Sequence, residues 1–311
     1  MPPSPKYSDP DVIARVSDLA LRSRRLVEGA ISGMHRSPFH GFNIEFASYR
    51  EYAPGDDLRR LDWRVFARSD RHYIKQYEEE SNVRVTFVVD ASASMNYKGR
   101  DATLSKFDYG ATMVVALSML LTRQQDPVGL VLFDEAAGTI LPHAATQAQV
   151  VVMTGLLERC TPARKTELGG LLRTLTDRLK RRSLLVVVSD LLTDLDSFHD
   201  GLDRLRFLGH EVLIMQVLDR DELELPFDGP TIFRDIEGDE ELFAEPWAFR
   251  RSYQQAMRDF LDGVRKECGK RGYDHVRFLT DEHLGPALST FLHAREETVR
   301  SGQQGTGGRG R

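Results

Sequence analysis

The sequence predicts an α/β fold, a doubly wound and mostly parallel sheet with helices on both faces and one antiparallel edge strand. Two observations predict it. From residue 83 onward, short apolar segments rich in β-branched residues alternate with longer segments of helical periodicity. The short segments are apolar at nearly every position, as in strands buried on both faces. This alternation is typical of parallel strands joined by crossover helices.

The expected elements follow one another along the chain. We expect strands near 83–89, 128–133, 184–189, 211–217 and 273–279. We expect helices near 105–123, 146–159, 168–181, 196–208 and 247–271, and a closing helix over 285–297. Residues 138–142 follow the second strand after a short acidic turn, so we expect them to return antiparallel as a hairpin. The segment 219–245 is acidic and aperiodic, and we expect an excursion over the sheet edge.

The N-terminal part differs in composition from the rest of the sequence, and we divide the chain into four regions. Residues 1–10 are rich in proline and expected to be loose, whereas 11–31 have the apolar spacing of an amphipathic helix. The segment 35–80 is rich in arginine and aromatic residues, with a possible strand at 71–77. We therefore predict a loose N-terminus (1–10), a helix with an irregular extension (11–80), an α/β domain (81–298) and a disordered Gly-rich tail (299–311).

Composition narrows the class of protein. The chain has 311 residues, 41% of them hydrophobic and 29% charged, with a formal net charge of -5. This mild negative charge argues against a dedicated nucleic-acid binder. No apolar run approaches the roughly 20 residues of a membrane helix, and the first residues do not resemble a secretory signal. The two cysteines have no metal or redox spacing. We therefore expect a cytoplasmic protein without a membrane span.

Polar side chains follow two of the predicted strands. Asp90, Ser92 and Ser94 come directly after the first strand, and Asp190 follows the strand at 184–189. Thr166 precedes the helix that begins near 168. Because the carboxyl ends of parallel strands meet at one edge of the sheet, we expect these five side chains to converge. Carboxylates and hydroxyls suit Mg²⁺ or Mn²⁺, with one coordination position left for a carboxylate from another molecule.

A structural alternative remains open for each residue of this set. Asp90 and Asp190 could simply cap neighbouring backbone amides, and the two serines could satisfy amides of their own loop. Taken singly, each residue favours this alternative, whereas their order and their position at strand ends jointly favour the metal site.

The combination resembles the von Willebrand factor A domain and its metal-ion-dependent adhesion site. The family pattern is Asp-x-Ser-x-Ser after the first strand, a threonine in the second loop and an aspartate after the fourth strand. Asp90, Ser92, Ser94, Thr166 and Asp190 match it. The resemblance implies that the serines and the threonine contact the metal and that the aspartates often act through water. Family members often carry Asp-Gly in the third loop, whereas Leu191 follows Asp190 here, which leaves that loop's geometry and the role of Asp194 open.

The irregular extension within residues 11–80 makes the resemblance more specific. Three of its segments, Gly41–Phe46, Arg50–Tyr52 and Pro54–Trp63, look like the signature of the bacterial proteins catalogued as domain of unknown function 58. The resemblance implies an A-type domain in the C-terminal half. It also implies a MoxR-type AAA+ ATPase, or a client of that ATPase, as the partner. A possible partner-facing patch comprises Arg59, Arg60, Asp62, Arg64 and Arg68. The same residues could instead form an ionic network that pins the segment to the sheet.

The leading functional prediction is a non-enzymatic, metal-dependent protein-interaction module acting as an adaptor or chaperone-like partner. The main alternative is a Mg²⁺-dependent phosphohydrolase with Asp90 as nucleophile. Ser92 stands where the haloacid dehalogenase type has a second aspartate, and no general acid or base is evident beside it. A nucleotide-binding function is weaker still, because Gly169-Gly170 alone is a thin phosphate cradle. The two arginines of the Gly-Arg tail would likewise give little contact with RNA.

Overall fold

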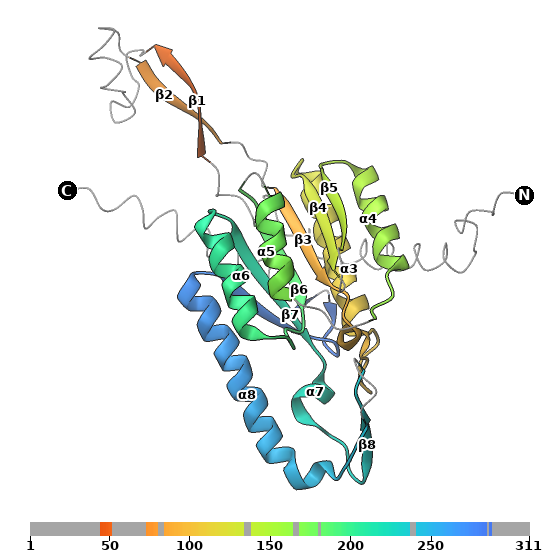
Figure 1. Ribbon diagram of the computed structural model, residues 1–311. Coiled ribbons are helices and arrows are strands. Elements are labelled where there is room, and N and C mark those ends of the chain that lie inside the picture. Colours follow the sequence, from red (N-terminus) through yellow and green to blue (C-terminus); the bar gives the residue numbers. More distant parts are fainter. Residues whose placement is uncertain are drawn as a thin grey trace, which may run out of the picture.

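A six-stranded sheet forms the centre of the molecule (Figure 1). The computed structural model describes residues 44–51, 73–79, 84–133, 138–163, 168–179, 182–236, 241–284 and 286–287. The strands of the central sheet are β3 (Val85–Asp90), β4 (Val128–Phe133), β5 (Thr139–Ala144), β6 (Leu184–Ser189), β7 (Glu211–Leu218) and β10 (Asp274–Leu279). Their order is β10-β7-β6-β3-β4-β5, and every neighbouring pair is parallel except β4 with β5. The predicted sheet, including its antiparallel edge strand, is confirmed.

The chain order of the strands creates a switch point in the middle of the sheet. From β3 the chain moves outward to β4 and β5, and it then returns to β6 on the opposite side of β3. The crossover segments therefore leave β3 and β6 in opposite directions, the arrangement beside which ligands bind in open α/β sheets. All six positions of β3, β4 and β6 are buried, which explains their unbroken apolar sequence.

Helices cover both faces of the sheet (Figure 1). The helices α3 (Lys106–Arg123) and α4 (Gln147–Arg159) lie on one face. The other face carries α5 (Leu168–Arg178), α6 (Leu195–Phe207) and α8 (Pro246–Arg271). Side-chain oxygens cap three of these helices at their N-termini, those of Ser105, Thr146 and Asp194. Each cap satisfies backbone N–H groups that the helix itself cannot pair.

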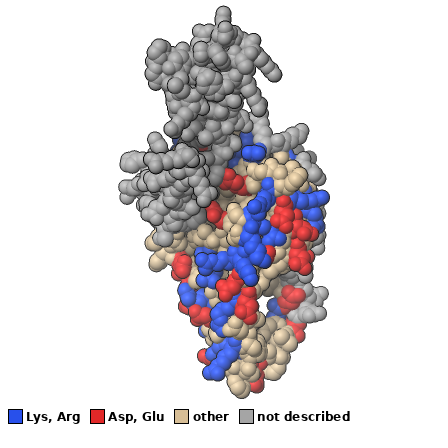
Figure 2. All heavy atoms as spheres, turned by 90° about the vertical axis from the view of Figure 1, so that its left-hand side faces the viewer, with Lys and Arg blue, Asp and Glu red and all other residues tan. Residues whose placement is uncertain are grey.

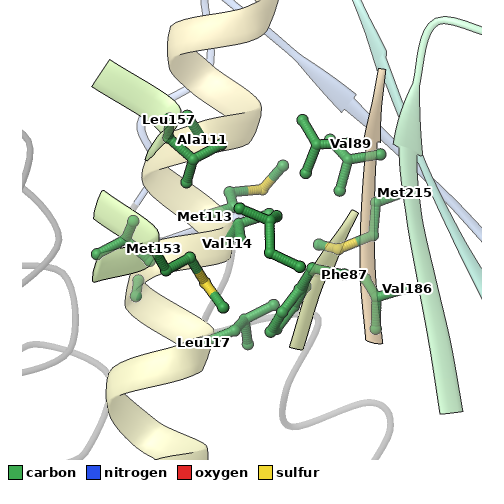
Figure 3. Packing of buried hydrophobic residues seen from close by; sticks show 14 of the residues in the cluster. Phe87, Val89, Ala111, Met113, Val114, Leu117, Met153, Leu157, Val186 and Met215 are labelled. Carbon is green, nitrogen blue, oxygen red and sulfur yellow. The ribbon is translucent and has the colours of Figure 1, made fainter. Parts of the chain in front are cut away.

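The two faces of the sheet bury separate hydrophobic clusters. Because side chains alternate along a strand, Phe87 of β3 points to the α3 face and its neighbour Val88 to the α5 and α6 face. On the first face, Phe87, Val186 and Met215 pack against Met113 and other residues of α3 (Figure 3). These contacts hold the start of α3 close to the carboxyl ends of β3 and β6.

The segment after β7 is more ordered than expected. It forms a short helix, α7 (Arg220–Glu224), followed by the hairpin strands β8 (Thr231–Arg234) and β9 (Glu241–Ala244). Asp219 and Glu222 form a capping box, in which each side chain accepts a backbone N–H at the start of α7. Five residues are too few to produce a helical apolar pattern, so this helix could not be read from periodicity.

A separate antiparallel pair precedes the central sheet. The strands β1 (Ile44–Glu51) and β2 (Tyr73–Glu79) pair with each other, and β2 corresponds to the strand considered for 71–77. The predicted helix over 11–31, nearly all of the closing helix and the Gly-rich tail lie outside the described residues. Among the described segments, no helix has both the length and the apolar character needed to cross a membrane.

The face formed by α6 and α8 carries interleaved charges of both signs, as Figure 2 shows. Arg271 near the end of α8 contacts Asp203 of α6 at 2.7 Å and Glu267 of its own helix at 2.7 Å. At the other end of α8, Arg250 contacts Asp228 at 2.8 Å. These ion pairs link α8 to α6 and to the segment after α7.

Candidate functional site

The predicted site lies at the switch point of the sheet. Asp90 is the last residue of β3, and Asp190 follows the last residue of β6, its direct neighbour. Ser92 and Ser94 belong to the loop after β3, which includes a short 3-10 helix, η3 (Ala93–Asn96). Two parallel strands that end side by side therefore bring both carboxylates and both hydroxyls to one place. The fifth predicted residue, Thr166, lies outside the described residues.

Hydrogen bonds fix both oxygens of Asp90. The backbone N–H of Ser92 donates to Asp90 Oδ1 at 2.8 Å, and the hydroxyl of Ser189 donates to Asp90 Oδ2 at 2.6 Å. Asp90 and Ser92 are only 5% and 4% exposed. Burial, and secondarily the nearby Asp190 carboxylate, raises the pKa of Asp90 to about 6. The burial and the neighbouring negative charge therefore disfavour the ionised form of Asp90.

The two serines connect Asp90's loop to Asp190. The Oγ atoms of Ser92 and Ser94 are 3.0 Å apart, and the hydroxyl of Ser94 donates to Asp190 Oδ2 at 2.8 Å. The other oxygen of Asp190 accepts the N–H of Leu192 at 3.0 Å. The structural alternative thus holds in part, because each aspartate uses one oxygen to cap a loop amide. The structure brings four of the five predicted residues together.

Two further charged residues belong to this cluster and were not predicted. Lys106 is fully buried, and its Nζ donates to Asp190 Oδ2 at 2.8 Å. The same Nζ donates to Glu222 of α7. Burial opposes the charged ammonium, but the carboxylates of Asp190 and Glu222 together raise the pKa of Lys106. A cation in the first turn of a helix is disfavoured by the helix dipole, and that was the sequence signal that could have indicated a special role.

Asp219 joins the loops around the site. Its Oδ2 accepts the backbone N–H of Gly99 at 2.9 Å and the hydroxyl of Thr280, while its Oδ1 accepts the N–H of Asp221 at 2.9 Å. A Cβ atom at Gly99 would lie 1.9 Å from Asp219 Oδ1, so the close approach requires glycine. The loop after β3 is therefore attached to the ends of β7 and β10.

The departure from the Asp-Gly pattern has a structural explanation. Leu191 has a φ of 62°, so it adopts the left-handed conformation that a glycine would adopt easily. Its side chain is fully buried in the cluster beneath α5 and α6. Gln216 of β7 donates to the carbonyl of Asp190 at 2.9 Å and supports the turn. Asp194, whose role was open, caps α6 by accepting the N–H groups of Asp196 and Ser197.

The donor set fits a small divalent cation. Mg²⁺ holds oxygens at about 2.0–2.1 Å in octahedral geometry, so adjacent ligand oxygens are about 2.9 Å apart. The Ser92–Ser94 and Ser94–Asp190 oxygen pairs have separations of 3.0 and 2.8 Å, close to this spacing. The described part of the set comprises two hydroxyls and two carboxylates, and the described residues contain no cluster of three or more His, Cys, Asp or Glu able to hold a metal.

The fold and the site define the class of protein. A mostly parallel sheet with one antiparallel edge strand, and Asp-x-Ser-x-Ser at its central switch point, make a von Willebrand factor A-like α/β protein. The chain belongs to the family described as protein of unknown function DUF58, whose model matches residues 48–260. The uncharacterized protein Rv1480 of Mycobacterium tuberculosis is 26% identical over 304 residues, covering 95% of this chain and 93% of that protein.

Solved structures with related folds were also found. An aerotolerance-related membrane protein from Bacteroides fragilis aligns with a TM-score of 0.47 and 16% identity, covering 70% of this chain and 100% of that one. The SpRpn10 VWA domain aligns with a TM-score of 0.35 and 10% identity, covering 44% of this chain and 75% of that domain.

The prediction of a cytoplasmic protein is wrong by this comparison. The Bacteroides fragilis neighbour is described as a membrane protein. A Vibrio fischeri neighbour, with a TM-score of 0.25 and 16% identity over 68% of this chain and 96% of its own, is described as membrane-spanning. The cytoplasmic prediction was based on the absence of a long apolar run and of a secretory signal in the sequence. Such absences do not establish where a protein is located.

Proposed function

We propose that the protein is a non-enzymatic, divalent-metal-dependent protein-interaction module. Asp90, Ser92, Ser94, Asp190 and Thr166 would hold Mg²⁺ or Mn²⁺, with Asp90 acting through water because both of its oxygens already accept hydrogen bonds. When bound, the metal supplies a Lewis-acidic position for an Asp or Glu side chain of the partner. The observation that carries the proposal is the chain of oxygens from Ser92 through Ser94 to Asp190 at the switch point of the sheet. Loop amides also orient the two carboxylates, because the N–H groups of Ser92 and Leu192 donate to Asp90 Oδ1 and Asp190 Oδ1, which supports the proposal.

The burial and hydrogen bonding of Asp90 favour binding over catalysis. A phosphohydrolase nucleophile must present a free carboxylate oxygen to the substrate. Both oxygens of Asp90 already accept hydrogen bonds, and its side chain is almost completely buried. In the loop after β3, the position of a second catalytic aspartate is occupied by Ser92. We therefore keep the phosphohydrolase only as the alternative to be tested.

The class of partner is inferred from the family resemblance. We propose a MoxR-type AAA+ ATPase, or a client of that ATPase, as the protein whose acidic residue the site receives. The ionic patch of Arg59, Arg60, Asp62, Arg64 and Arg68 lies outside the described residues and stays a prediction.

Metal titration and a defined binding assay test the proposal. Isothermal titration calorimetry with Mn²⁺ should detect binding by the wild type, reduced at least about tenfold in Asp90→Ala and in Ser94→Ala. Purified MoxR-type ATPase from the same genome should co-elute with the wild type, and EDTA or either substitution should abolish co-elution. Asp196→Ala is the matched control, because it removes an exposed carboxylate near the same sheet edge outside the site.

Two results would contradict the proposal. Co-elution that survives both EDTA and Asp90→Ala would exclude metal-dependent recognition. Mg²⁺-dependent turnover of a phosphate ester that is lost in Asp90→Asn would favour the phosphohydrolase instead.

A further inference from the structure

A fully buried lysine beside a proposed metal site calls for a reason. Removing an ammonium from water costs several kcal/mol unless partners compensate. Lys106 also occupies the first turn of α3, where the helix dipole disfavours positive charge. The side chain nevertheless is 0% exposed, so strong local interactions hold it there.

The ammonium of Lys106 binds an oxygen of the proposed site itself. Asp190 Oδ2 receives both Lys106 Nζ and the hydroxyl of Ser94, each at 2.8 Å. Asp190 Oδ2 is also the last of the three successive oxygens of the proposed site, after Ser92 Oγ and Ser94 Oγ. A positive charge built into the protein is thus already placed at the edge of the site.

Glu222 is the second hydrogen-bond acceptor of the Lys106 ammonium. One oxygen of Glu222 accepts Lys106 Nζ, and the other accepts the backbone N–H of Asp219 at 2.8 Å as part of the α7 capping box. The hydroxyl of Tyr253 in α8 donates to the backbone carbonyl of Glu222 at 2.7 Å. Glu222 is therefore held in place from two sides, and it would retain the ammonium if Asp190 were withdrawn.

The charges around Lys106 match a site that can exist in two forms. Two carboxylates, those of Asp190 and Glu222, share the Lys106 ammonium, and the buried Asp90 carboxylate lies near Asp190. In the observed arrangement, Lys106 neutralises Asp190. A divalent cation near the same Asp190 oxygen would repel the ammonium strongly at this distance.

We propose that Lys106 is a tethered cation that stabilises the metal-free site, and that metal binding releases its ammonium from Asp190 while Glu222 retains it. This inference rests on the proposed metal-dependent function. Its consequence is that Lys106 lowers the affinity for metal and makes the fold independent of it. The release also couples the metal site to α7, because Glu222 belongs to that helix.

The first test compares Lys106→Met with wild type in EDTA and in Mg²⁺. In EDTA the melting temperature of the variant should fall, because Asp190 and Glu222 lose their buried cation. Mg²⁺ should restore a larger part of the melting temperature in the variant than in the wild type. Calorimetry should show metal binding tighter by about tenfold or more in the variant, since a repelling charge is gone.

Lys98→Met is the matched control. Lys98 lies in the same loop after β3 but is exposed, so its substitution removes an equal charge without touching Asp190. It should leave both the melting temperature and the metal affinity close to those of wild type. An equal gain in metal affinity for both variants would show a general charge effect and overturn the inference.

A second measurement uses the wild type, in case Lys106→Met does not fold. In protein labelled with ¹⁵N-lysine, the buried ammonium should give a slowly exchanging ¹⁵Nζ signal. Mg²⁺ should shift this signal in proportion to binding measured by calorimetry. A signal that is unchanged at saturating Mg²⁺ would overturn the inference.

The outcomes separate this inference from the proposed function. Metal binding by the variant but not by wild type would support the tethered cation and contradict metal dependence in the natural protein. Equal binding by both would support the proposed function and overturn the role of Lys106. Binding by neither would overturn both.

Discussion

At the scale of single residues, each aspartate of the candidate site uses its two oxygens for different contacts. Asp90 Oδ1 and Asp190 Oδ1 cap the N–H groups of Ser92 and Leu192, which shapes the two loops. Their other oxygens face the hydroxyls of Ser189 and Ser94. The capping and metal-binding interpretations of the sequence are therefore not exclusive, because a carboxylate has two oxygens and several lone pairs.

Leu191 shows how one loop geometry can be reached with a different residue. The left-handed conformation costs a non-glycine residue roughly 1–2 kcal/mol. Full burial of the Leu191 side chain contributes more than that, so leucine is stabilising here despite the strain.

We predict that Leu191→Gly destabilises the protein by about 2–3 kcal/mol in urea unfolding, because the lost packing outweighs the relieved strain. Its metal affinity should stay within about threefold of wild type, since glycine keeps the turn conformation. Leu192→Ala is the control, because Leu192 is 43% exposed and should change stability by about 0.5 kcal/mol or less. A more stable Leu191→Gly variant would mean that strain dominates.

At the scale of elements, glycines let α5 and α6 pack closely together. A Cβ atom at Gly169 in α5 would lie 2.4 Å from the backbone carbonyl of Ser197 in α6. Gly201 of α6 makes a similar close approach, because a Cβ atom there would lie 2.6 Å from the Cβ of Leu172 in α5. Gly169 therefore has a structural role in place of the weak phosphate cradle considered from sequence.

We predict that Gly169→Ala lowers the free energy of unfolding by about 1–3 kcal/mol, because backbone must move to admit the methyl group. Gly263→Ala in α8 is the matched control. Nothing lies within 4 Å of a Cβ atom there, so alanine should be neutral or stabilising by up to about 1 kcal/mol. Urea unfolding monitored by circular dichroism measures both, and equal effects would refute close α5–α6 packing.

At the scale of the whole molecule, both edge strands of the central sheet carry a histidine kept neutral. In β5, His143 Nε2 lies 2.9 Å from the Thr86 hydroxyl of β3. In β10, His275 Nε2 lies 3.0 Å from Gln216 Oε1. Burial, and secondarily nearby arginines, lowers the pKa of each histidine from 6.5 to about 4.

We predict that these histidines make the fold sensitive to acid. Because the folded-state pKa lies below the unfolded value, their contribution is present above pH 6.5 and is lost as the pH falls toward 4. The loss should be on the order of 1–2 kcal/mol for each histidine. Urea unfolding across this range should show a smaller pH slope in the double variant His143→Gln, His275→Gln. His283→Gln, at an exposed histidine, is the matched control.

The sequence by itself determined the order and type of the main elements and the location of the candidate site. Unbroken apolar segments revealed the buried strands, and the carboxyl ends of parallel strands had to meet at one edge. For that reason Asp90, Ser92, Ser94 and Asp190 could be predicted without coordinates. The division of the chain into domains stays a prediction.

Only the tertiary structure decided which other residues complete the site. Lys106 and Glu222 are 116 positions apart, and their pairing depends on how α7 folds back over the switch point. Leu191 adopts a glycine-like conformation because burial of its side chain compensates for the strain. Such contacts depend on packing between distant segments, which local periodicity does not encode. The sequence thus located a candidate cation site, and the structure showed that the protein already places a cation of its own beside it.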